Sequence, residues 1–289
     1  MSELMAWVNG ELVARTGASV SIDDAAVKYG AAVFETMRVS GGRVFRWERH
    51  LERLQRGLDG MGAVLPSEAD LASAVESILR ANRLTDARVR LSVSAGSMVT
   101  PDLSEAVSPT VIVTADELRG DAPVAVRLRV SSLRIDESRP LGFAKTAQYL
   151  IYLLARAESR AAGAGDALLL NHRGEVCEAA TANVFALIDR RLVTPSLDAG
   201  PVAGVARGVV LELAKEQGLD CDEHGLSLAE LGDATELFLT NSIVGVQPIS
   251  QVEGVDGVEL WRTPKSPAVI ADRLAEAYAL AVARECGEG

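Results

Sequence analysis

The stretch GDALLLNHRGEVCEAATANVFAL, residues 165–187, contains two strand-like runs around a turn. Residues 166–170 and 183–188 are short apolar runs with the length of buried strands, and the NHRG sequence at 171–174 is typical of a turn. Glu178 follows that turn as a single acid among alanine and threonine residues. Composition alone favours a solubilising residue at a sheet edge. In a ligand site, the carboxylate would instead keep a pyridine nitrogen protonated.

Upstream of this stretch, Lys145 stands in the sequence LGFAKTAQYL, residues 141–150. Most lysines are solvated surface charges, and this is the ordinary interpretation. The four residues before Lys145 are small or apolar: Leu141, Gly142, Phe143 and Ala144. They indicate a partly desolvated amine, whose lowered pKa makes the neutral, nucleophilic form accessible. A lysine that forms a Schiff base requires that property.

Downstream, two short segments suit a phosphate group. In PVAGVARGVV, residues 201–210, a loop with Gly204 leads into a helix, and helix N-termini bind phosphate. In FLTNSIVGVQP, residues 238–248, a strand ends in a polar turn where Asn241 and Ser242 offer hydrogen-bond donors. No GKS or GKT follows the first segment, so it is not a P-loop. Taken singly, each segment is also an ordinary junction between secondary-structure elements.

Residues 1–118 have the pattern of a small α+β domain. An Asn9-Gly10 turn and a Ser40-Gly41-Gly42 turn each predict a hairpin, and apolar residues at helical spacing predict helices. The polar segment 115–122 lacks apolar periodicity and is interpreted as a linker. The predicted elements are hairpins over 6–13 and 31–46, helices over 47–60 and 67–83, and strands over 87–95 and 109–114.

Residues 119–289 have the pattern of a larger α/β domain, which would carry Lys145. Gly218 is a stop signal for the helix that begins at Gly204. The chain shows no internal repeat. Besides the strands at 166–170 and 183–188, the predicted elements are a strand over 123–135, helices over 146–163 and 204–218, a strand over 236–240 and a closing helix over 267–285.

The composition narrows the class of protein. The chain has 289 residues, 48% hydrophobic and 24% charged, which is typical of a globular protein. Its net charge of −11 argues against nucleic acid and anionic membranes as partners. The cysteines are scattered and odd in number, which fits a reducing cytoplasm. The three histidines lack metal-ligand spacing, so no metal is expected. No apolar run is long enough to cross a membrane.

An ordered set of motifs through almost the whole chain resembles one family. The chain is similar to the fold-type IV pyridoxal-phosphate enzymes: the branched-chain aminotransferase, D-amino-acid aminotransferase and aminodeoxychorismate lyase family. That resemblance implies a two-domain fold with a pseudo-barrel-like C-terminal domain, pyridoxal 5'-phosphate in the cleft between the domains, and a homodimer. The matching motifs are VNGEL at 8–12, YGAAVFETMRV at 29–39, RHLERL at 49–54, KTAQYL at 145–150, residues 165–187, LVTPSLDAGPVAGVAR at 192–207 and ELFLTNSIVGVQPI at 236–249.

The resemblance also implies a role for each matching residue. Lys145 is similar to the lysine that forms the Schiff base, and Glu178 to the partner of the pyridine nitrogen. Arg53 is similar to the phosphate-binding arginine, whose fork suits a dianion. The expected cofactor contacts are completed by the helix start at Gly204, Val205 and Ala206, the turn at Asn241 and Ser242, Val202 against the ring, and Tyr149 at the phenolic oxygen.

Several positions depart from the family pattern. Ala206 stands where a threonine is common, so one hydroxyl contact to phosphate is lost. The sequence DAAVKYGAAVFE lacks the usual arginine and Asp-Gly pair. The Asn241-Ser242-Ile243 turn looks more like the lyase branch, yet SAGSMVT at 94–100 lacks the arginine-glycine signature of lyases. The RGxxxRxH-like signature of D-specific enzymes is absent as well.

Five residues are expected to contact substrate. Arg90 shares one strand face with Arg88, whereas Val89 and Leu91 take the other face. An exposed charged face is the ordinary interpretation, but the resemblance places Arg90 beside the substrate, where it would bind the α-carboxylate. For Lys28, a solvated surface lysine is the more ordinary interpretation. The expected substrate contacts are Lys28, Tyr29, Phe34, Arg38 and Arg90.

These residues together predict an aminotransferase with ping-pong kinetics, which moves an amino group between an amino acid and a 2-keto acid. The alternative is a lyase that releases pyruvate from 4-amino-4-deoxychorismate. A cofactor-binding protein without catalysis is disfavoured because Lys145 and Glu178 are both present. The residues leave open whether the substrate is an L-amino acid, a D-amino acid or a primary amine.

Overall fold

The computed structural model describes residues 3–118, 124–264 and 269–287. Its contacts divide the chain into two compact units. The first consists of Met1–Gly120, Ala144–Gln148 and Val282–Gly289, and the second of Asp121–Phe143 and Tyr149–Ala281. The division predicted between residues 118 and 119 stays a prediction. The short segment around Lys145, however, makes its contacts with the first unit.

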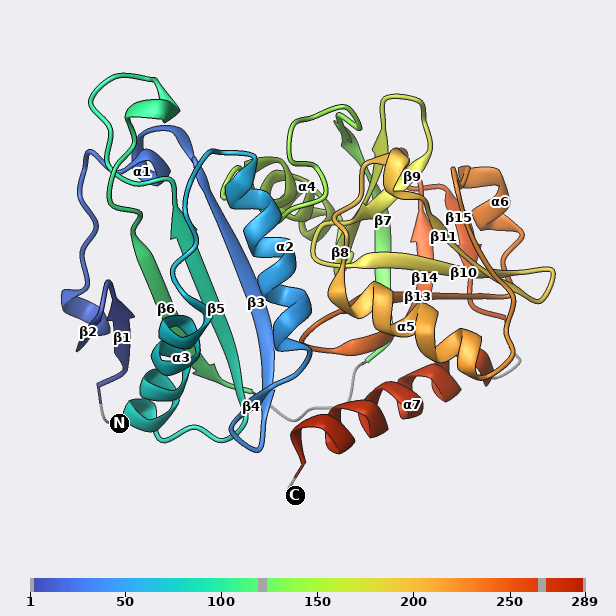
Figure 1. The fold of residues 1–289 in the computed structure, drawn as a ribbon. Coiled ribbons are helices and arrows are strands. Elements are labelled where there is room, and N and C mark those ends of the chain that lie inside the picture. Colours follow the sequence, from blue (N-terminus) through green and yellow to red (C-terminus); the bar gives the residue numbers. More distant parts are fainter. Residues whose placement is uncertain (1–2, 119–123, 265–268, 288–289) are drawn as a thin grey trace. The chain divides into compact units, whose positions relative to one another are not determined.

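The first unit is built on a six-stranded antiparallel sheet (Figure 1). Both predicted hairpins are confirmed: Asn9 and Gly10 have φ values of 47° and 100° in the first, and Gly41 and Gly42 form the turn of the second. The strand order is β2-β1-β6-β5-β3-β4. The strands are β1 (Met5–Val8), β2 (Glu11–Ala14), β3 (Ala32–Ser40), β4 (Arg43–Val44), β5 (Ala87–Ser94) and β6 (Val111–Glu117).

Two amphipathic helices, α2 (Trp47–Asp59) and α3 (Glu68–Asn82), cover one face of this sheet (Figure 1). Both were predicted within one residue of their ends. Val89 and Leu91 of β5 are buried, whereas Arg88 and Arg90 are exposed, as strand alternation predicted. Apolar side chains of β3 and β5 therefore point toward the helices, and the arginines occupy the other face.

A short helix that the sequence patterns did not predict, α1 (Ala25–Tyr29), precedes β3. Asp24 is its N-cap and accepts a hydrogen bond from the Ala26 amide, while Gly30 ends the helix with φ 67°. The buried Asp24 carboxylate also accepts hydrogen bonds from the hydroxyls of Ser94 and Thr110. These bonds fix α1, and with it Lys28 and Tyr29, to the start of the sheet.

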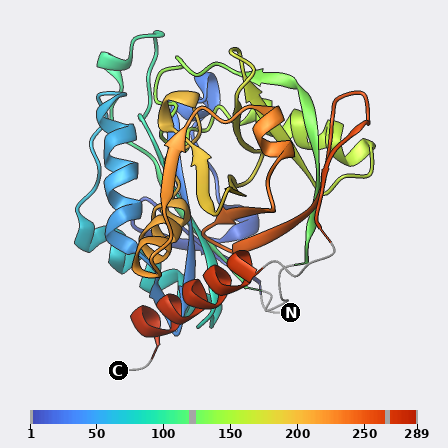
Figure 2. The ribbon, with the colours of Figure 1, turned by 90° about the vertical axis from the view of Figure 1, so that its right-hand side faces the viewer.

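The second unit contains a nine-stranded mixed sheet that curls into a half-barrel (Figure 2). Its order is β12-β11-β10-β13-β14-β7-β8-β9, with β15 paired to β14. The strands are β7 (Val126–Ile135), β8 (Asp166–Asn171), β9 (Val176–Ala179), β10 (Asn183–Ile188), β11 (Arg191–Pro195), β12 (Cys221–His224), β13 (Glu236–Asn241), β14 (Gly245–Glu253) and β15 (Glu259–Arg262).

The core of this unit is apolar and contains Leu128, Leu168, Val184 and Leu239. Strands β8, β10 and β13 are buried on both faces, and β8 and β10 are accordingly almost continuous apolar runs. None of the described helices is long and apolar enough to cross a membrane. The remaining helices are α4 (Leu150–Ala161), α5 (Val205–Glu216), α6 (Leu228–Gly232) and α7 (Val269–Cys286). Single 3-10 turns lie at Leu197–Ala199 in this unit and at Arg15–Gly17 and Leu103–Glu105 in the first unit.

Two predictions require correction. The helix predicted over 146–163 begins at Leu150, because residues 145–147 pair with β3 instead. The predicted linker 115–122 overlaps β6, where Ala115 is fully buried opposite Val89. Residues 119–122 of that linker, the first residue of the strand predicted over 123–135 and the first two of the helix predicted over 267–285 lie outside the described residues.

Candidate active site

Lys145 lies in an extended segment that pairs with β3. The Phe34 amide donates to the Lys145 carbonyl at 2.8 Å, and the Ala147 amide donates to the Ala32 carbonyl at 2.8 Å. Residues directly opposite each other on antiparallel strands point to the same face. The Lys145 side chain therefore follows that of Phe34, and Nζ lies 5.1 Å from the centre of the phenyl ring.

The same ring is in contact with Arg90, the residue predicted to bind the carboxylate of the substrate. The guanidinium carbon of Arg90 lies 3.6 Å from the Phe34 ring centre. Arg90 is opposite Thr36 in the register of β3 and β5, so it shares the sheet face that carries Phe34. Phe34 is only 5% exposed. The first unit thus brings together three of the predicted residues, with an amine and a guanidinium both attracted to one aromatic ring.

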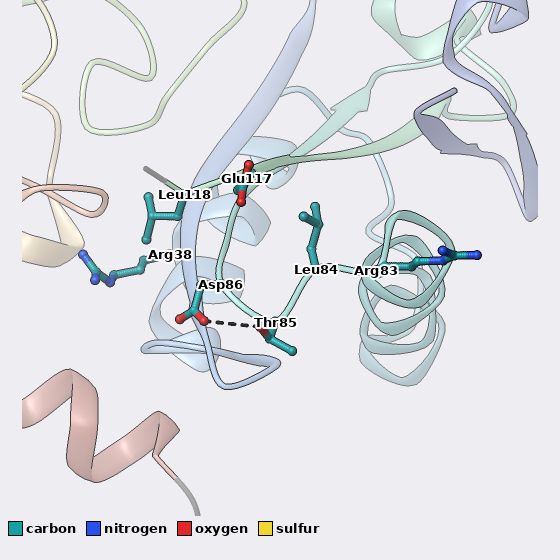
Figure 3. A pocket seen from close by; sticks show the side chains of 7 residues that line it. All are labelled: Arg38, Arg83, Leu84, Thr85, Asp86, Glu117 and Leu118. Carbon is teal, nitrogen blue, oxygen red and sulfur yellow. Dashed lines mark hydrogen bonds between the residues drawn. The ribbon is translucent and has the colours of Figure 1, made fainter. Parts of the chain in front are cut away.

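Arg38 lies on the same strand but away from this group. It follows Phe34 by four residues, roughly 13 Å along the strand. There it lines a pocket of about 410 Å³, in which Thr85 donates a hydrogen bond to Asp86 (Figure 3). The other lining residues are Arg83, Leu84, Glu117 and Leu118. The structure therefore does not bring Arg38 together with Lys145.

The amine of Lys28 is engaged with the loop that follows β5. Its Nζ donates to the carbonyls of Met98 at 3.0 Å and Val99 at 3.3 Å. Nζ also lies 5.7 Å from the ring centre of Tyr29, which is 45% exposed. Lys28 therefore tethers the loop to α1.

Arg53 points to the helix-covered side of the sheet, where it is buried with two residues that the sequence interpretation did not single out. Its Nε and Nη2 donate to the two oxygens of Glu35 at 2.8 and 2.6 Å. His50 Nδ1 lies 2.6 Å from Glu35 Oε2. Burial alone would raise the pKa of Glu35, but the charge of Arg53 and hydrogen bonds from His50 and Arg53 outweigh it and lower the pKa to about 2.

The signal that could have revealed this cluster is the spacing of its members. His50 and Arg53 are three residues apart and so lie on one face of α2. Glu35 lies on the β3 face that α2 covers. The Nε2 atom of the fully buried His50 has no hydrogen-bond partner among the described residues.

In the second unit, Glu178 on β9 is almost fully buried and held by several donors. The Tyr152 hydroxyl donates to Oε1 at 2.7 Å, and the Val202 amide donates to Oε2 at 3.1 Å. Arg139 Nη2 lies 3.9 Å from Oε1. Donors on both oxygens stabilise the negative charge of the carboxylate. Of these partners, the sequence interpretation named Val202 but neither Tyr152 nor Arg139.

Tyr149 lies beside this group at the N-cap position of α4. Its ring stacks on that of Tyr152 with 4.7 Å between the ring centres. Its hydroxyl donates to the Ala180 carbonyl at 2.7 Å. The stack is part of a small buried cluster next to Glu178 that includes Cys177.

The loop that carries Val202 leads directly into α5. Asn183 donates to the Val202 carbonyl at 2.9 Å. A Cβ atom on Gly204 would lie only 1.9 Å from Asn183 Oδ1, so the close approach requires glycine. No side chain caps α5, whose first residues Val205 and Ala206 are buried. The first amides of a helix lack intrahelical acceptors and are suited to bind an anion.

The turn at Asn241 and Ser242 lies at the same end of the sheet as the start of α5. Asn183 pairs with Thr240 in the register of β10 and β13. The Asn241 side-chain oxygen accepts hydrogen bonds from the amides of Ile243 and Val244. The side chain thus shapes the turn and occupies these two amides, and the uncapped start of α5 is the group of donors suited to a phosphate.

Comparison with known proteins identifies the family to which the chain belongs. The family model described as amino-transferase class IV matches residues 32–252, well over half of the chain. The chain belongs to the class IV aminotransferase family. Among the described residues, no cluster of histidine, cysteine or acidic side chains forms a metal site.

Relatives in the class IV family have different activities. The chain is 30% identical over 254 residues to a probable branched-chain-amino-acid aminotransferase of Rickettsia felis, covering 86% of each chain. It is 31% identical to an aminodeoxychorismate lyase of Bacillus subtilis, covering 87% of this chain and 88% of the relative. A D-alanine aminotransferase of Listeria monocytogenes is 27% identical, with 97% of each covered.

Solved class IV structures share the fold. The branched-chain aminotransferase of Thermoproteus uzoniensis, solved with norvaline, has a TM-score of 0.87 at 28% identity, covering 98% of this chain and 96% of that one. The expected fold-type IV architecture is therefore confirmed. The family depends on pyridoxal phosphate. The donors at the start of α5 suit its phosphate, and the buried carboxylate of Glu178 suits its ring nitrogen.

Proposed function

We propose that the protein is a pyridoxal-phosphate-dependent aminotransferase, which moves an amino group between a D-amino acid or a branched-chain L-amino acid and a 2-keto acid. The observation that carries the proposal is the placement of Lys145 and Arg90 around the Phe34 ring. An α-amino acid has its amine and carboxylate on one carbon. An enzyme that exchanges the amine therefore needs a reactive lysine with a carboxylate-binding cation nearby.

Each side chain has a distinct task in this proposal. When bound, pyridoxal phosphate supplies the aldehyde carbon for amine exchange and a ring that withdraws electrons from the substrate's α-carbon. Lys145 Nζ would take the α-proton as a general base and, as a general acid, would deliver it to the aldehyde-derived carbon of the cofactor. Arg90 holds the α-carboxylate in a bidentate grip. Glu178 accepts a hydrogen bond from the ring nitrogen and stabilises its positive charge.

The cofactor would be held by residues with donors or apolar surface. Arg53, the Val205 and Ala206 amides after Gly204, and the turn at Asn241 and Ser242 are proposed for the phosphate. The uncapped start of α5 supports this assignment. Val202 and Tyr149 are proposed to contact the ring and its phenolic oxygen. For the substrate, Phe34 is proposed as an apolar contact, with Tyr29 and Lys28 at the outer edge of the site. Arg38, which lies roughly 13 Å along β3 from Phe34, is not retained as a substrate contact.

The second candidate is a 4-amino-4-deoxychorismate lyase that releases pyruvate and 4-aminobenzoate. The Asn241-Ser242-Ile243 turn supports it because this turn resembles the lyase branch. The Bacillus subtilis lyase, similar over most of its length, supports it too. Absence of the lyase signature at residues 94–100 favours the aminotransferase.

One set of assays separates the two activities. The purified protein is loaded with pyridoxal phosphate and offered L- and D-amino acids and a primary amine, each with 2-oxoglutarate or pyruvate. An aminotransferase shifts the cofactor's absorption band with a donor and restores it with a keto acid. Pyruvate released from aminodeoxychorismate without a keto acid would establish the lyase instead. A protein that shows neither response would contradict both.

We further propose a cytoplasmic homodimer. Three large apolar side chains on α4 support a partner surface, because Leu150, Leu153 and Leu154 are each more than half exposed. Free cysteines support a reducing compartment. Light scattering after size-exclusion chromatography should give twice the chain mass, and a monomer at micromolar concentration would contradict the dimer.

A further inference from the structure

A directed chain of hydrogen bonds ends on the Glu178 carboxylate. Arg139 Nη2 donates to the Tyr152 hydroxyl oxygen at 3.0 Å, and the Tyr152 hydroxyl donates to Glu178 Oε1 at 2.7 Å. The other carboxylate oxygen accepts from the Val202 amide. Three residues from separate segments of the second unit therefore fix the orientation of one carboxylate.

The Tyr152 hydroxyl can only act as a donor to Glu178. Burial raises the pKa of Tyr152 well above its usual range, and the charge of Glu178 raises it further. The hydroxyl therefore keeps its proton at neutral pH. Its oxygen accepts from Arg139, so the proton is directed toward the carboxylate. Donors aligned in one direction polarise each other and strengthen each bond.

Arg139 is anchored by backbone carbonyls of two loops. Nη1 donates to the Asp136 carbonyl at 3.0 Å, and Nη2 donates to the Gly200 carbonyl at 2.8 Å. Gly200 has φ +95°, and a Cβ atom there would lie 2.9 Å from the backbone of Glu137. A glycine is needed at this position. The same guanidinium therefore fixes Tyr152 and the start of the loop that carries Val202.

We propose that Arg139 and Tyr152 are positioning residues that hold the Glu178 carboxylate, charged and oriented, for the nitrogen of a protonated pyridine ring. This rests on the proposed function, in which Glu178 faces the cofactor ring. By drawing negative charge toward Oε1, the two side chains set how strongly the carboxylate holds a proton on the ring. They tune the electron demand of the bound cofactor without touching it.

The test uses the pyridoxal-phosphate-loaded protein and the variants Tyr152→Phe, Arg139→Met and Arg139→Lys. Loss of one hydrogen bond to a charged group should lower kcat roughly ten-fold in Tyr152→Phe, with KM changed less than about two-fold. The pH midpoint at which the cofactor's absorption band converts should shift in Tyr152→Phe and in Arg139→Met. Arg139→Lys, which keeps the charge, should shift the midpoint less than Arg139→Met does.

A matched control removes a buried hydroxyl that serves only the fold. Thr194→Val loses the 2.8 Å bond to the Val184 carbonyl in the same unit. It should lower the melting temperature and leave the absorption midpoint unchanged. If Tyr152→Phe and Arg139→Met lower only the melting temperature, as the control does, the positioning role is wrong. A wild-type protein without any cofactor band would instead contradict the proposed function.

Discussion

Phe34 joins the two side chains on which the proposed chemistry depends. Its backbone amide holds the Lys145 carbonyl, and its ring contacts both Lys145 and Arg90. The position of Lys145 is thus set by a strand more than a hundred residues earlier in the chain. Lys145 is partly buried, which makes its side chain less mobile than that of a surface lysine.

Substitution of Lys145 tests the assignment of the reactive amine. Lys145→Ala should abolish turnover, by at least about a thousand-fold, because it removes the amine that is proposed to take the α-proton. The characteristic band of the bound cofactor should also disappear, while the melting temperature of the apo-protein changes little. Exposed Lys215 provides the control, because Lys215→Ala should keep both band and turnover. An adduct in Lys145→Ala that borohydride can trap would refute the assignment.

Arg90 and Arg88 provide a comparison between neighbouring arginines on one strand face. Arg88 is paired with Asp116 at 3.1 Å, whereas Arg90 lies on the Phe34 ring. Arg90→Ala should raise KM for amino acids roughly 10- to 100-fold, because the substrate carboxylate would lose a charged hydrogen bond. Arg88→Ala and Lys28→Ala should change this KM little. Steady-state kinetics with amino acids and with primary amines measure this. Equal harm to both donor types would point to a structural role for Arg90.

At the scale of elements, the start of α5 is held in place by contacts from both sides of its loop. The loop before it is tied to Glu178 and Asn183, and Gly204 leaves no room for a side chain. The first amides of α5 are therefore held in place before any ligand binds. This preorganisation lowers the entropy cost of binding.

Gly204→Ala tests that constraint. The added methyl group would have to displace Asn183, which moves the start of α5 and misaligns its amides. The dissociation constant for pyridoxal phosphate, measured by titration of the apo-protein, should rise at least about ten-fold, as for one lost charged hydrogen bond. Gly17→Ala is the control, since a methyl group there meets nothing within 4 Å. Unchanged affinity in Gly204→Ala would remove α5 from the proposed phosphate site.

Elements with strong local signals were predicted well from the sequence, whereas several short strands, and the nine-residue β14 with its irregular burial pattern, were not. The helices α2, α3 and α5 have clear apolar periodicity, and the first hairpin has its Asn-Gly turn. In contrast, β9, β12 and β15 have four residues each, too few to show a period. Residues 146–149 look helical, but Thr146 and Ala147 pair with β3 because a distant strand overrides local propensity.

The candidate site divides in a similar way. Lys145 and Glu178 stand in motifs that a family resemblance can identify. Arg139, Tyr152 and Asn183 act through contacts between segments far apart in sequence, and no local pattern marks them. Glu35 was also missed, because a carboxylate in an apolar strand is informative only once its partners on α2 are known.

At the scale of the whole molecule, the buried cluster of Glu35, His50 and Arg53 links stability to pH. Because the pKa of Glu35 falls from 4.5 in the unfolded chain to about 2 in the folded protein, its contribution to stability is fully present above pH 4.5. That contribution is lost as the pH falls from 4.5 toward 2. Wild-type protein should therefore lose unfolding free energy steeply across this window.

Two variants isolate the contribution of the cluster. Glu35→Gln leaves Arg53 buried without its carboxylate and should cost about 3–5 kcal/mol at pH 7. Its stability should depend less on pH between 4.5 and 2. Removing the charge as well, in Glu35→Gln with Arg53→Met, should recover part of the loss. Denaturant unfolding of the apo-proteins at several pH values measures these effects, and parallel pH curves for wild type and Glu35→Gln would contradict the cluster's role.

The placement of residues 144–148 has a consequence for how the chain folds. Phe143 and Tyr149 belong to the second unit, while the five residues between them complete an edge of the first. During synthesis, β3 emerges from the ribosome long before the segment around Lys145 that pairs with it. The start of β3 therefore lacks this partner until more than half the chain has left the ribosome. Closing so long a loop is slow. Placement of Lys145, the proposed reactive amine, therefore belongs among the late events of folding, after the sheet of the first unit has formed.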